Sequence, residues 1–251
     1  VYDVNYLNPF AFNANSGFKT NLYDFMYFSL RISTIFLIIF GITMAANLIA
    51  MEYENGTIKL LAIRPYKRYK LITGKMFATM FFVLIFILFA FLISFIAGIA
   101  VYPTTLTMTS VLTVFNGSNV LLINPLVLMF INLISIIFEV LFYVIIAVAI
   151  STIFKSFAGA ISCSLILYIV GFVLNIFLGN MLWYAFMPFV NLDFYKFFGG
   201  AFIADRSNMF ASMLTSPVLS NMSFFISIAI YASFIAISLV VTYLAFRRKE
   251  F

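Results

Sequence analysis

The chain has 251 residues, of which 65% are hydrophobic and only 9% are charged. A soluble globular domain carries about a quarter charged residues, and a single core of this size cannot bury so much apolar surface. With no histidine and one cysteine, the chain lacks the side chains for a Ser-His-Asp triad, a His-ligated metal or an internal disulfide. The composition therefore predicts a membrane protein and excludes a soluble enzyme of these classes.

Five apolar segments are long enough to cross a bilayer, because about twenty helical residues span a hydrocarbon core of roughly 30 Å. Backbone groups in lipid must be hydrogen-bonded within the segment, which favours helices over barrel strands at these lengths. No internal repeat or linker divides the chain, so we expect one all-α domain over residues 1–251, a polytopic transmembrane helical bundle. The predicted spans are residues 25–50, 77–102, 125–152, 158–180 and 222–246.

The basic residues are concentrated in three of the connecting regions. Ten of the fourteen Lys and Arg lie there, with six in residues 51–75, one at Lys155 and three in residues 247–249. By the positive-inside rule these regions, and with them the C-terminus, are cytoplasmic. The basic excess therefore reports topology, and no nucleic-acid partner is expected. Residue 1 then lies on the outer side, which predicts a sixth span before it in the full protein.

The outer side is expected to hold residues 1–24, 103–124 and 181–221. The last of these regions mixes ten aromatic side chains with Pro188 and the pair Gly199-Gly200. Aromatic residues interrupted by Pro and Gly beside a membrane are typical of short interfacial or re-entrant helices. The alternative is a plain ordered outer loop.

The cytoplasmic connection 51–75 has the pattern of a short helix between two turns. Asn55-Gly56 is a turn signal, since Gly accepts a positive φ, and Thr57 follows as a helix N-cap. Residues 58–64 then form two helical turns, which Pro65 ends. A helix held at both ends by membrane spans transmits the pull of a cytosolic partner to them. The alternative is a basic helix that rests on anionic lipid.

This connection carries a resemblance to a known family. It resembles the segment between the second and third spans of ABC-2-type transporter permeases, the transmembrane subunits of bacterial ABC exporters. The turn Phe154-Lys155-Ser156 and the stretch 187–192 are similar to two further, weaker motifs of that family. The resemblance covers nearly the whole chain. Its main motif is Glu52-x-Glu54-x-Gly56-Thr57, followed by Leu60-Leu61, Pro65, Arg68 and Gly74-Lys75.

The resemblance implies that two permease subunits pair, as a homodimer or a heterodimer, and bind two copies of a cytosolic ATPase subunit. ATP and Mg are expected in that ATPase. This chain has no Walker A motif, because its one Gly-Lys pair, Gly74-Lys75, is followed by Met and lacks the earlier Gly. On its own it is thus not expected to be an enzyme. The ATPase-coupling residues implied by the resemblance are Glu52, Glu54, Gly56, Thr57, Leu60, Leu61, Arg64, Pro65 and Arg68.

The implied function is export by alternating access across the bacterial cytoplasmic membrane. Among small ABC-2 permeases, the chain resembles exporters of bacitracin-like, lantibiotic or phenol-soluble-modulin peptides. The expected substrates are therefore amphipathic peptides or hydrophobic antimicrobials. Export of a polysaccharide or lipid-linked glycan is the alternative within the family. From a different class, an intramembrane enzyme or a scramblase would use Glu139.

Two charged residues lie inside predicted spans. Glu139 is near the centre of its span, where an ionised carboxylate costs about 2.5–3.5 kcal/mol, so it is expected to face protein or water. With Asn132 it is a candidate for the substrate path or for carrying a proton; the alternative is a protonated acid bonded to a neighbouring helix. Arg31 is expected to snorkel outward, or else to pair with Asp24 or Asp193. Asn47, Asn132 and Asn175 are expected to form interhelical hydrogen bonds.

Overall fold

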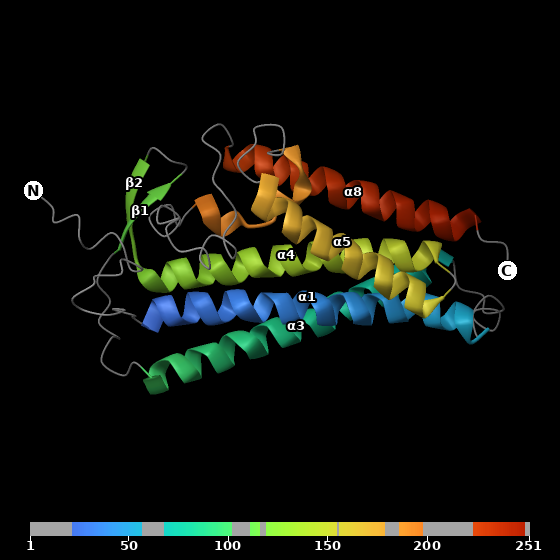
Figure 1. The fold of residues 1–251 in the computed structure, drawn as a ribbon, viewed down its shortest axis with the longest axis horizontal. Helices are drawn as coiled ribbons and strands as arrows, with labels where there is room; N and C mark the ends of the chain where they lie inside the picture. Colours follow the sequence, from blue (N-terminus) through green and yellow to red (C-terminus); the bar gives the residue numbers. More distant parts are fainter. Residues whose placement is uncertain are drawn as a thin grey trace, which may run out of the picture.

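In the part of the chain that the structure describes, five long helices run side by side along the longest axis of the molecule (Figure 1). The computed structural model describes residues 22–56, 68–101, 111–115, 119–154, 156–178, 186–197 and 223–248. Within these ranges five helices are long and apolar enough to cross a membrane. The predicted all-α polytopic bundle is thus confirmed. The helices are α1 (Leu22–Glu54), α3 (Arg68–Val101), α4 (Pro125–Ile153), α5 (Phe157–Leu178) and α8 (Phe224–Arg248).

The helices extend further into the predicted cytoplasmic connection than the apolar runs alone indicate. α1 continues to Glu54, and α3 already begins at Arg68. The end of α1 is a turn in which Gly56 has a φ of 68°, the left-handed conformation that favours glycine after a helix. The predicted helix 58–64 and its candidate residues lie outside the described residues. These are Thr57, Leu60, Leu61, Arg64 and Pro65; Arg68 is placed only as the first residue of α3.

At the opposite end of the bundle, part of the predicted outer loop 103–124 forms a hairpin. Strand β1 (Val111–Phe115) pairs antiparallel with β2 (Asn119–Ile123). The chain then enters α4 directly, because the side chain of Asn124 accepts a hydrogen bond from the backbone N–H of Leu126 at 3.0 Å, with proline in the first turn. The hairpin is a local addition to the all-α bundle.

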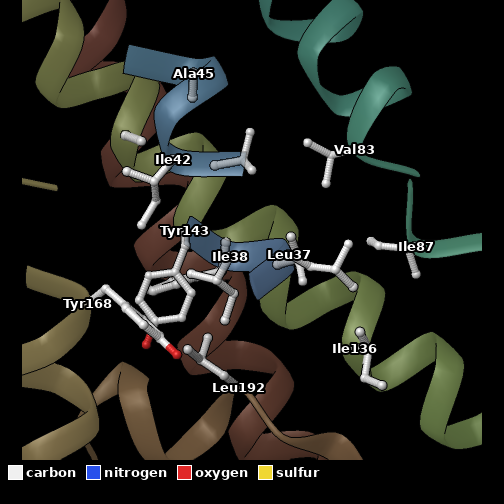
Figure 2. Packing of buried hydrophobic residues seen from close by; sticks show 14 of the residues in the cluster. Leu37, Ile38, Ile42, Ala45, Val83, Ile87, Ile136, Tyr143, Tyr168 and Leu192 are labelled. Atoms are coloured by element: carbon white, nitrogen blue, oxygen red, sulfur yellow. The ribbon is translucent and has the colours of Figure 1, made fainter. Parts of the chain in front are cut away.

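α4 is the central helix of the bundle. Of its spanning window 61% is buried inside the protein, against 17% for α3 and 11% for α8. Figure 2 shows the core that surrounds it, to which α1, α3 and α5 all contribute. The outer faces of α3 and α8 carry exposed Phe, Leu and Ile side chains, which is the pattern of lipid-facing helices. The core cluster includes Leu37, Ile38, Ile42, Val83, Ile87, Ile136, Tyr143, Tyr168 and Leu192.

Two short 3-10 helices lie within the predicted outer region 181–221. These are η3 (Pro188–Asn191) and η4 (Phe194–Phe197), which pack between α4, α5 and α8. Asn191 fixes η3 to α8, since its Oδ1 accepts a hydrogen bond from Ser227 Oγ at 2.7 Å. The remainder of that region, 181–185 and 198–221, lies outside the described residues.

Candidate functional site

The end of α1 that leads into the predicted coupling segment is bonded to the neighbouring helix α5. Glu54 Oε2 accepts a hydrogen bond from the backbone N–H of Phe157, the first residue of α5, at 3.0 Å. A carboxylate at a helix N-terminus satisfies a free N–H and faces the positive end of the helix dipole. Glu54 therefore caps a helix that starts 103 positions later in the chain.

The same end of α1 is also tied to α3 and α4. Glu52 forms an ion pair with Lys75 of α3. Ser151 of α4 bridges two backbone groups of α1: its Oγ donates to the carbonyl of Ala46 at 2.8 Å and accepts from the N–H of Ala50 at 3.0 Å. All three contacts lie within about three turns of the last residue of α1.

Small residues allow this close approach of helices. Ala46 and Ala50 of α1 pack directly against Ala160 of α5, and all three are completely buried. Small side chains at an interface let membrane helices approach closely. The small-residue stretch at the start of α5 thus makes a contact within the chain. Near Glu54 and Glu52, four of the five long helices are joined into one unit, which we call the coupling-end junction.

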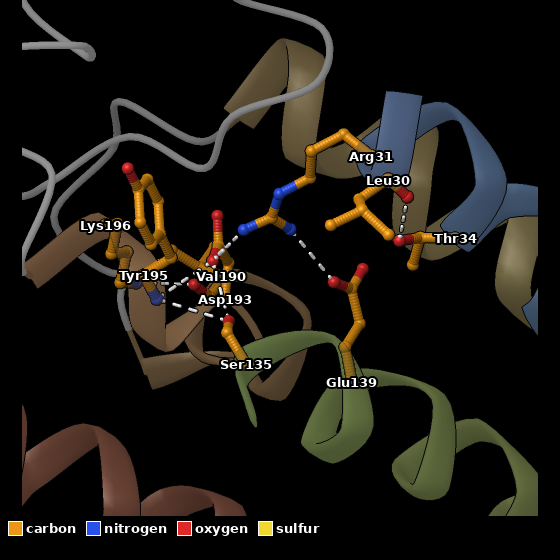
Figure 3. A network of polar contacts seen from close by, with 9 residues as sticks. All are labelled: Leu30, Arg31, Thr34, Ser135, Glu139, Val190, Asp193, Tyr195 and Lys196. Carbon is orange, nitrogen blue, oxygen red and sulfur yellow. Dashed lines mark hydrogen bonds and ion pairs between the residues drawn. The ribbon is translucent and has the colours of Figure 1, made fainter. Parts of the chain in front are cut away.

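A second polar site lies inside the bundle. Arg31 of α1 forms ion pairs with two carboxylates, through Nη2 with Asp193 and through Nη1 with Glu139 of α4 at 3.2 Å (Figure 3). Arg31 and Asp193 are buried, with side chains 5% exposed, whereas Glu139 is 20% exposed. An Arg guanidinium has a planar set of donors, so one cation can hold two acids in fixed positions. The pairs connect α1, α4 and the segment between η3 and η4.

The two carboxylates differ in how many donors they have. Asp193 Oδ1 accepts from Arg31, from Ser135 Oγ at 3.0 Å and from the backbone N–H of Tyr195 at 3.1 Å. Glu139 accepts from Arg31 alone among the described residues. Hydrogen bonds to the charged form stabilise a carboxylate. Asp193 is therefore the firmly held anion of the pair.

Lys196 is the second buried cation of this region. It lies on η4, and its Nζ donates to the carbonyl oxygen of Val190 at 2.5 Å. Burial lowers the pKa of Lys196 to about 8, and the negative charge of Asp193 opposes this effect. At pH 7 the amine is thus still mostly protonated. With all four groups ionised, the charges of Arg31, Lys196, Asp193 and Glu139 balance.

A small cavity of about 60 Å³ opens beside the ion pairs. Its polar wall is formed by Arg31, Glu139, Asp193 and Asn175, together with two tyrosines, Tyr143 and Tyr168. The Nε of Arg31 is buried and has no hydrogen-bond partner among the described residues. A cavity of this size with several polar groups has room for a few water molecules. Within the described ranges, no group of three or more His, Cys, Asp and Glu could hold a metal ion.

The structure corrects two expectations about polar residues in the spans. Arg31 does not snorkel outward, because two acids inside the bundle offset its desolvation; the alternative pairing with Asp193 is the one observed. The side chain of Asn47 is exposed on α1 and makes no interhelical hydrogen bond among the described residues. The expectation of interhelical hydrogen bonds is thus not met at this position.

Glu139 and Asn132, the two predicted intramembrane site residues, are not brought together. Glu139 lines the cavity and accepts a hydrogen bond from Arg31 of the neighbouring helix α1. Asn132 is buried outside the cavity wall, and its Oδ1 has no hydrogen-bond partner in the part of the chain that the structure describes. Sequence reasoning missed Ser135, for which the only signal was a hydroxyl one helical turn before Glu139.

The sequence is similar to those of two uncharacterized relatives. The chain is 23% identical over 219 residues to "Uncharacterized protein YhcI" of Bacillus subtilis (strain 168), a match that covers 86% of this chain and 65% of that protein. It is 27% identical over 161 residues to "Uncharacterized membrane protein YdbK" of the same organism, covering 63% of this chain and 61% of the relative. The chain thus spans less than two thirds of the length of either relative.

The five spans make this chain a multi-pass membrane protein. No catalytic activity is named in the descriptions of its relatives. One family matches almost the entire sequence, residues 2–251, and its description is "Protein of unknown function (DUF2705)". On the strength of that coverage, the chain belongs to the DUF2705 family.

Proposed function

We propose that this chain is the transmembrane permease subunit of a bacterial ATP-driven ABC exporter of the ABC-2 type. The observation that carries the proposal is the coupling-end junction. Glu54 caps α5, Glu52 pairs with Lys75 of α3, and Ser151 joins α4 to the backbone of α1. A partner that moves the connection between α1 and α3 would therefore move four helices together.

The junction supports coupling better than it supports a helix that only rests on lipid. A surface-bound segment needs an apolar face and basic residues, but it does not need cross-links from its flanking helix to three other spans. A segment that transmits force needs a stiff connection to the bundle. The motif residues Glu52 and Glu54, which resemble the family signature, are the side chains that supply this connection.

In this proposal two permease subunits pair and each binds a cytosolic ATPase subunit, in which ATP and Mg are held. Closure of the ATPase pair draws the two connections together and opens the bundles outward. The predominantly apolar interior of the chain favours amphipathic peptides or hydrophobic antimicrobials as substrates. The segment η3–η4 packs against α4, α5 and α8 at the opposite end. In this proposal it acts as the exit gate.

The geometry argues against an intramembrane enzyme or scramblase that uses Glu139. Ligand pockets are typically about 300–1,000 Å³, whereas the cavity beside Glu139 measures about 60 Å³. A lipid headgroup does not fit there.

The proposal is tested by co-purifying the full chain in detergent with a candidate ABC ATPase subunit from the same organism, and measuring vanadate-sensitive ATP hydrolysis. The double variant Glu52→Lys/Gly56→Pro places like charges opposite Lys75 and removes the positive φ at residue 56. We expect loss of the complex or at least about a tenfold fall in hydrolysis, because the connection is no longer held in place.

The matched control is Gly74→Ala, also near this end of the bundle, where an added Cβ meets no atom within 4 Å. It should bind and stimulate the ATPase like the wild type. If the wild-type chain binds no ATPase, the exporter proposal fails. Equal hydrolysis in wild type and double variant would show that this connection does not couple the subunits.

A further inference from the structure

The cavity beside Arg31 contains two carboxylates that share one guanidinium but are held differently. Asp193 accepts hydrogen bonds from three donors and is almost fully buried. Glu139 accepts one hydrogen bond, at 3.2 Å, and is 20% exposed. The negative charge of Asp193 repels the Glu139 carboxylate, so the net stabilisation of that carboxylate is smaller than in an isolated ion pair with Arg31.

The groups around Glu139 can be named element by element. Arg31 approaches from α1, Asp193 from the segment between η3 and η4, Tyr143 from α4 itself and Tyr168 from α5. Lys196 of η4 lies behind Asp193 and is bonded to the carbonyl of Val190. No second cation from the described residues lines the cavity beside Glu139. Its carboxylate is thus the weakest-held charge of the cluster.

The cavity supplies what a protonation site in a membrane needs. Glu139 lies at the middle of α4, far from both ends of the helix, where an ionised side chain is costly unless it is paired. The cavity has room for water beside its carboxylate, so a proton has a donor close at hand. Arg31 Nε, unpaired and buried in the same wall, can hold such a water in place.

We propose that this cavity is a proton-binding site in which Glu139 takes up and releases the proton while Asp193 stays ionised and keeps Arg31 in place. On uptake, an O–H bond forms on the Glu139 carboxylate with a proton delivered through cavity water. Arg31 keeps its charge and its pair with Asp193. The tie between α1 and α4 is thereby weakened, and the tie between α1 and the η3–η4 segment is kept. This inference does not rest on the exporter assignment, because proton binding is a property of this chain alone.

The sequence makes a direct test practical. It contains only four glutamates, Glu52, Glu54, Glu139 and Glu250, so a full chain labelled with carbon-13 at the glutamate carboxyl gives four NMR signals. The chain is placed in lipid bilayers and titrated from about pH 5 to about pH 9, the range in which buried carboxyls can titrate. The signal that disappears in Glu139→Gln assigns the site.

We expect the Glu139 signal to move between its acid and carboxylate positions within this range. In Asp193→Asn, where Arg31 pairs with Glu139 alone, the protonated fraction of Glu139 at pH 7 should fall several-fold. Glu54→Gln, which alters a carboxylate outside the cavity, should leave the Glu139 titration unchanged.

Two results would overturn the proposal. The first is a Glu139 signal that stays at one position over the whole pH range in the wild type, since the group then does not exchange a proton. The second is a signal that moves when sodium chloride is added at fixed pH, because the cavity would then bind a metal cation in place of a proton. Both measurements use the wild-type chain. If Glu139→Gln fails to fold, Glu52→Gln, Glu54→Gln and Glu250→Gln assign the other three signals and leave that of Glu139 by elimination.

Discussion

At the scale of single residues, charge pairing decides the arrangement of the bundle interior. The sequence offered Asp24 and Asp193 as alternative partners of Arg31, and the structure pairs Arg31 with Asp193 and also with Glu139. Removal of one partner from a buried ion pair costs about 3–5 kcal/mol, because the other charge stays unpaired. A buried triad of this kind holds α1, α4 and the η3–η4 segment in one register.

Lys196 gives a residue-scale prediction for the pH dependence of stability. Burial lowers its pKa to about 8 from an ordinary value of 10.5, with the nearby Asp193 opposing the change. Below about pH 8 both folded and unfolded chains carry the proton, and the folded state bears the full cost, about 3 kcal/mol. Between about pH 8 and 10.5 the unfolded chain binds more protons, so stability rises with pH.

The variant Lys196→Met removes this charge and is expected to stabilise the protein at pH 7 by about 1–3 kcal/mol, the lower figure allowing for the donor lost at the Val190 carbonyl. Its advantage over the wild type should shrink between pH 8 and pH 10. Unfolding in detergent micelles at both pH values checks this. For Lys70→Met, at an exposed position on α3, the stability difference from the wild type should not change between these pH values. If the stability difference for Lys196→Met is also constant, Lys196 does not titrate near pH 8 in the folded protein.

At the scale of elements, the spans could be predicted from sequence and their continuations could not. Apolar runs of this length in lipid have to be helical, so all five predicted spans are observed. α1 continues to Glu54 and α3 begins at Arg68, each beyond its apolar run. These extra turns are rich in charged residues, so a hydropathy pattern does not predict that they are helical. The hairpin β1–β2 had a local signal, since Asn116-Gly117 separates two apolar runs.

The candidate site was harder to predict than the spans, and the reason is separation along the chain. Arg31 and Asp193 are 162 positions apart, and Arg31 and Glu139 are 108 apart. Sequence reasoning identified Glu139 as costly in lipid, and it named Asp193 only as one of two alternative partners of Arg31. Which partner is chosen depends on how η3 and η4 fold back against α4, and no local pattern encodes this return.

The contact between η3 and α5 gives an element-scale prediction. Gly171 lies where α5 meets the ring of Phe189 on η3, and a Cβ at this position would be only 2.5 Å from Cδ1 of that ring. Gly171→Ala should therefore push η3 away from α5 and destabilise the protein by about 1–3 kcal/mol, as overpacking does in other cores. Thermal unfolding in detergent measures the loss.

Gly74→Ala is the matched control for this substitution. It lies in a helix and has open space around the added Cβ, so it should be neutral or gain up to about 1 kcal/mol from higher helix propensity. If Gly171→Ala is as stable as Gly74→Ala, the packing of η3 against α5 is not what holds the segment.

At the scale of the whole molecule, the charges divide the bundle into two ends. The start of α3 carries Arg68, Lys70 and Lys75, and the end of α8 carries Arg247-Arg248. In Figure 1 these two helix ends lie at the same end of the bundle. Toward the other end the described basic residues are Arg31 and Lys196, which are both buried and not displayed on the surface. The positive-inside rule predicts that the first end faces the cytoplasm.

This orientation is tested with single cysteines in a Cys163→Ser background. Lys70 and Asn124 are exposed at opposite ends of the bundle, at the starts of α3 and α4. In intact cells, a membrane-impermeant maleimide should label Asn124→Cys and should leave Lys70→Cys unlabelled until the membrane is permeabilised. Both positions end or begin helices that cross the whole bundle, so the two results fix the direction of every span at once. Labelling of Lys70→Cys alone in intact cells would invert the topology, place the coupling-end junction outside the cell and remove the basis for binding a cytosolic ATPase.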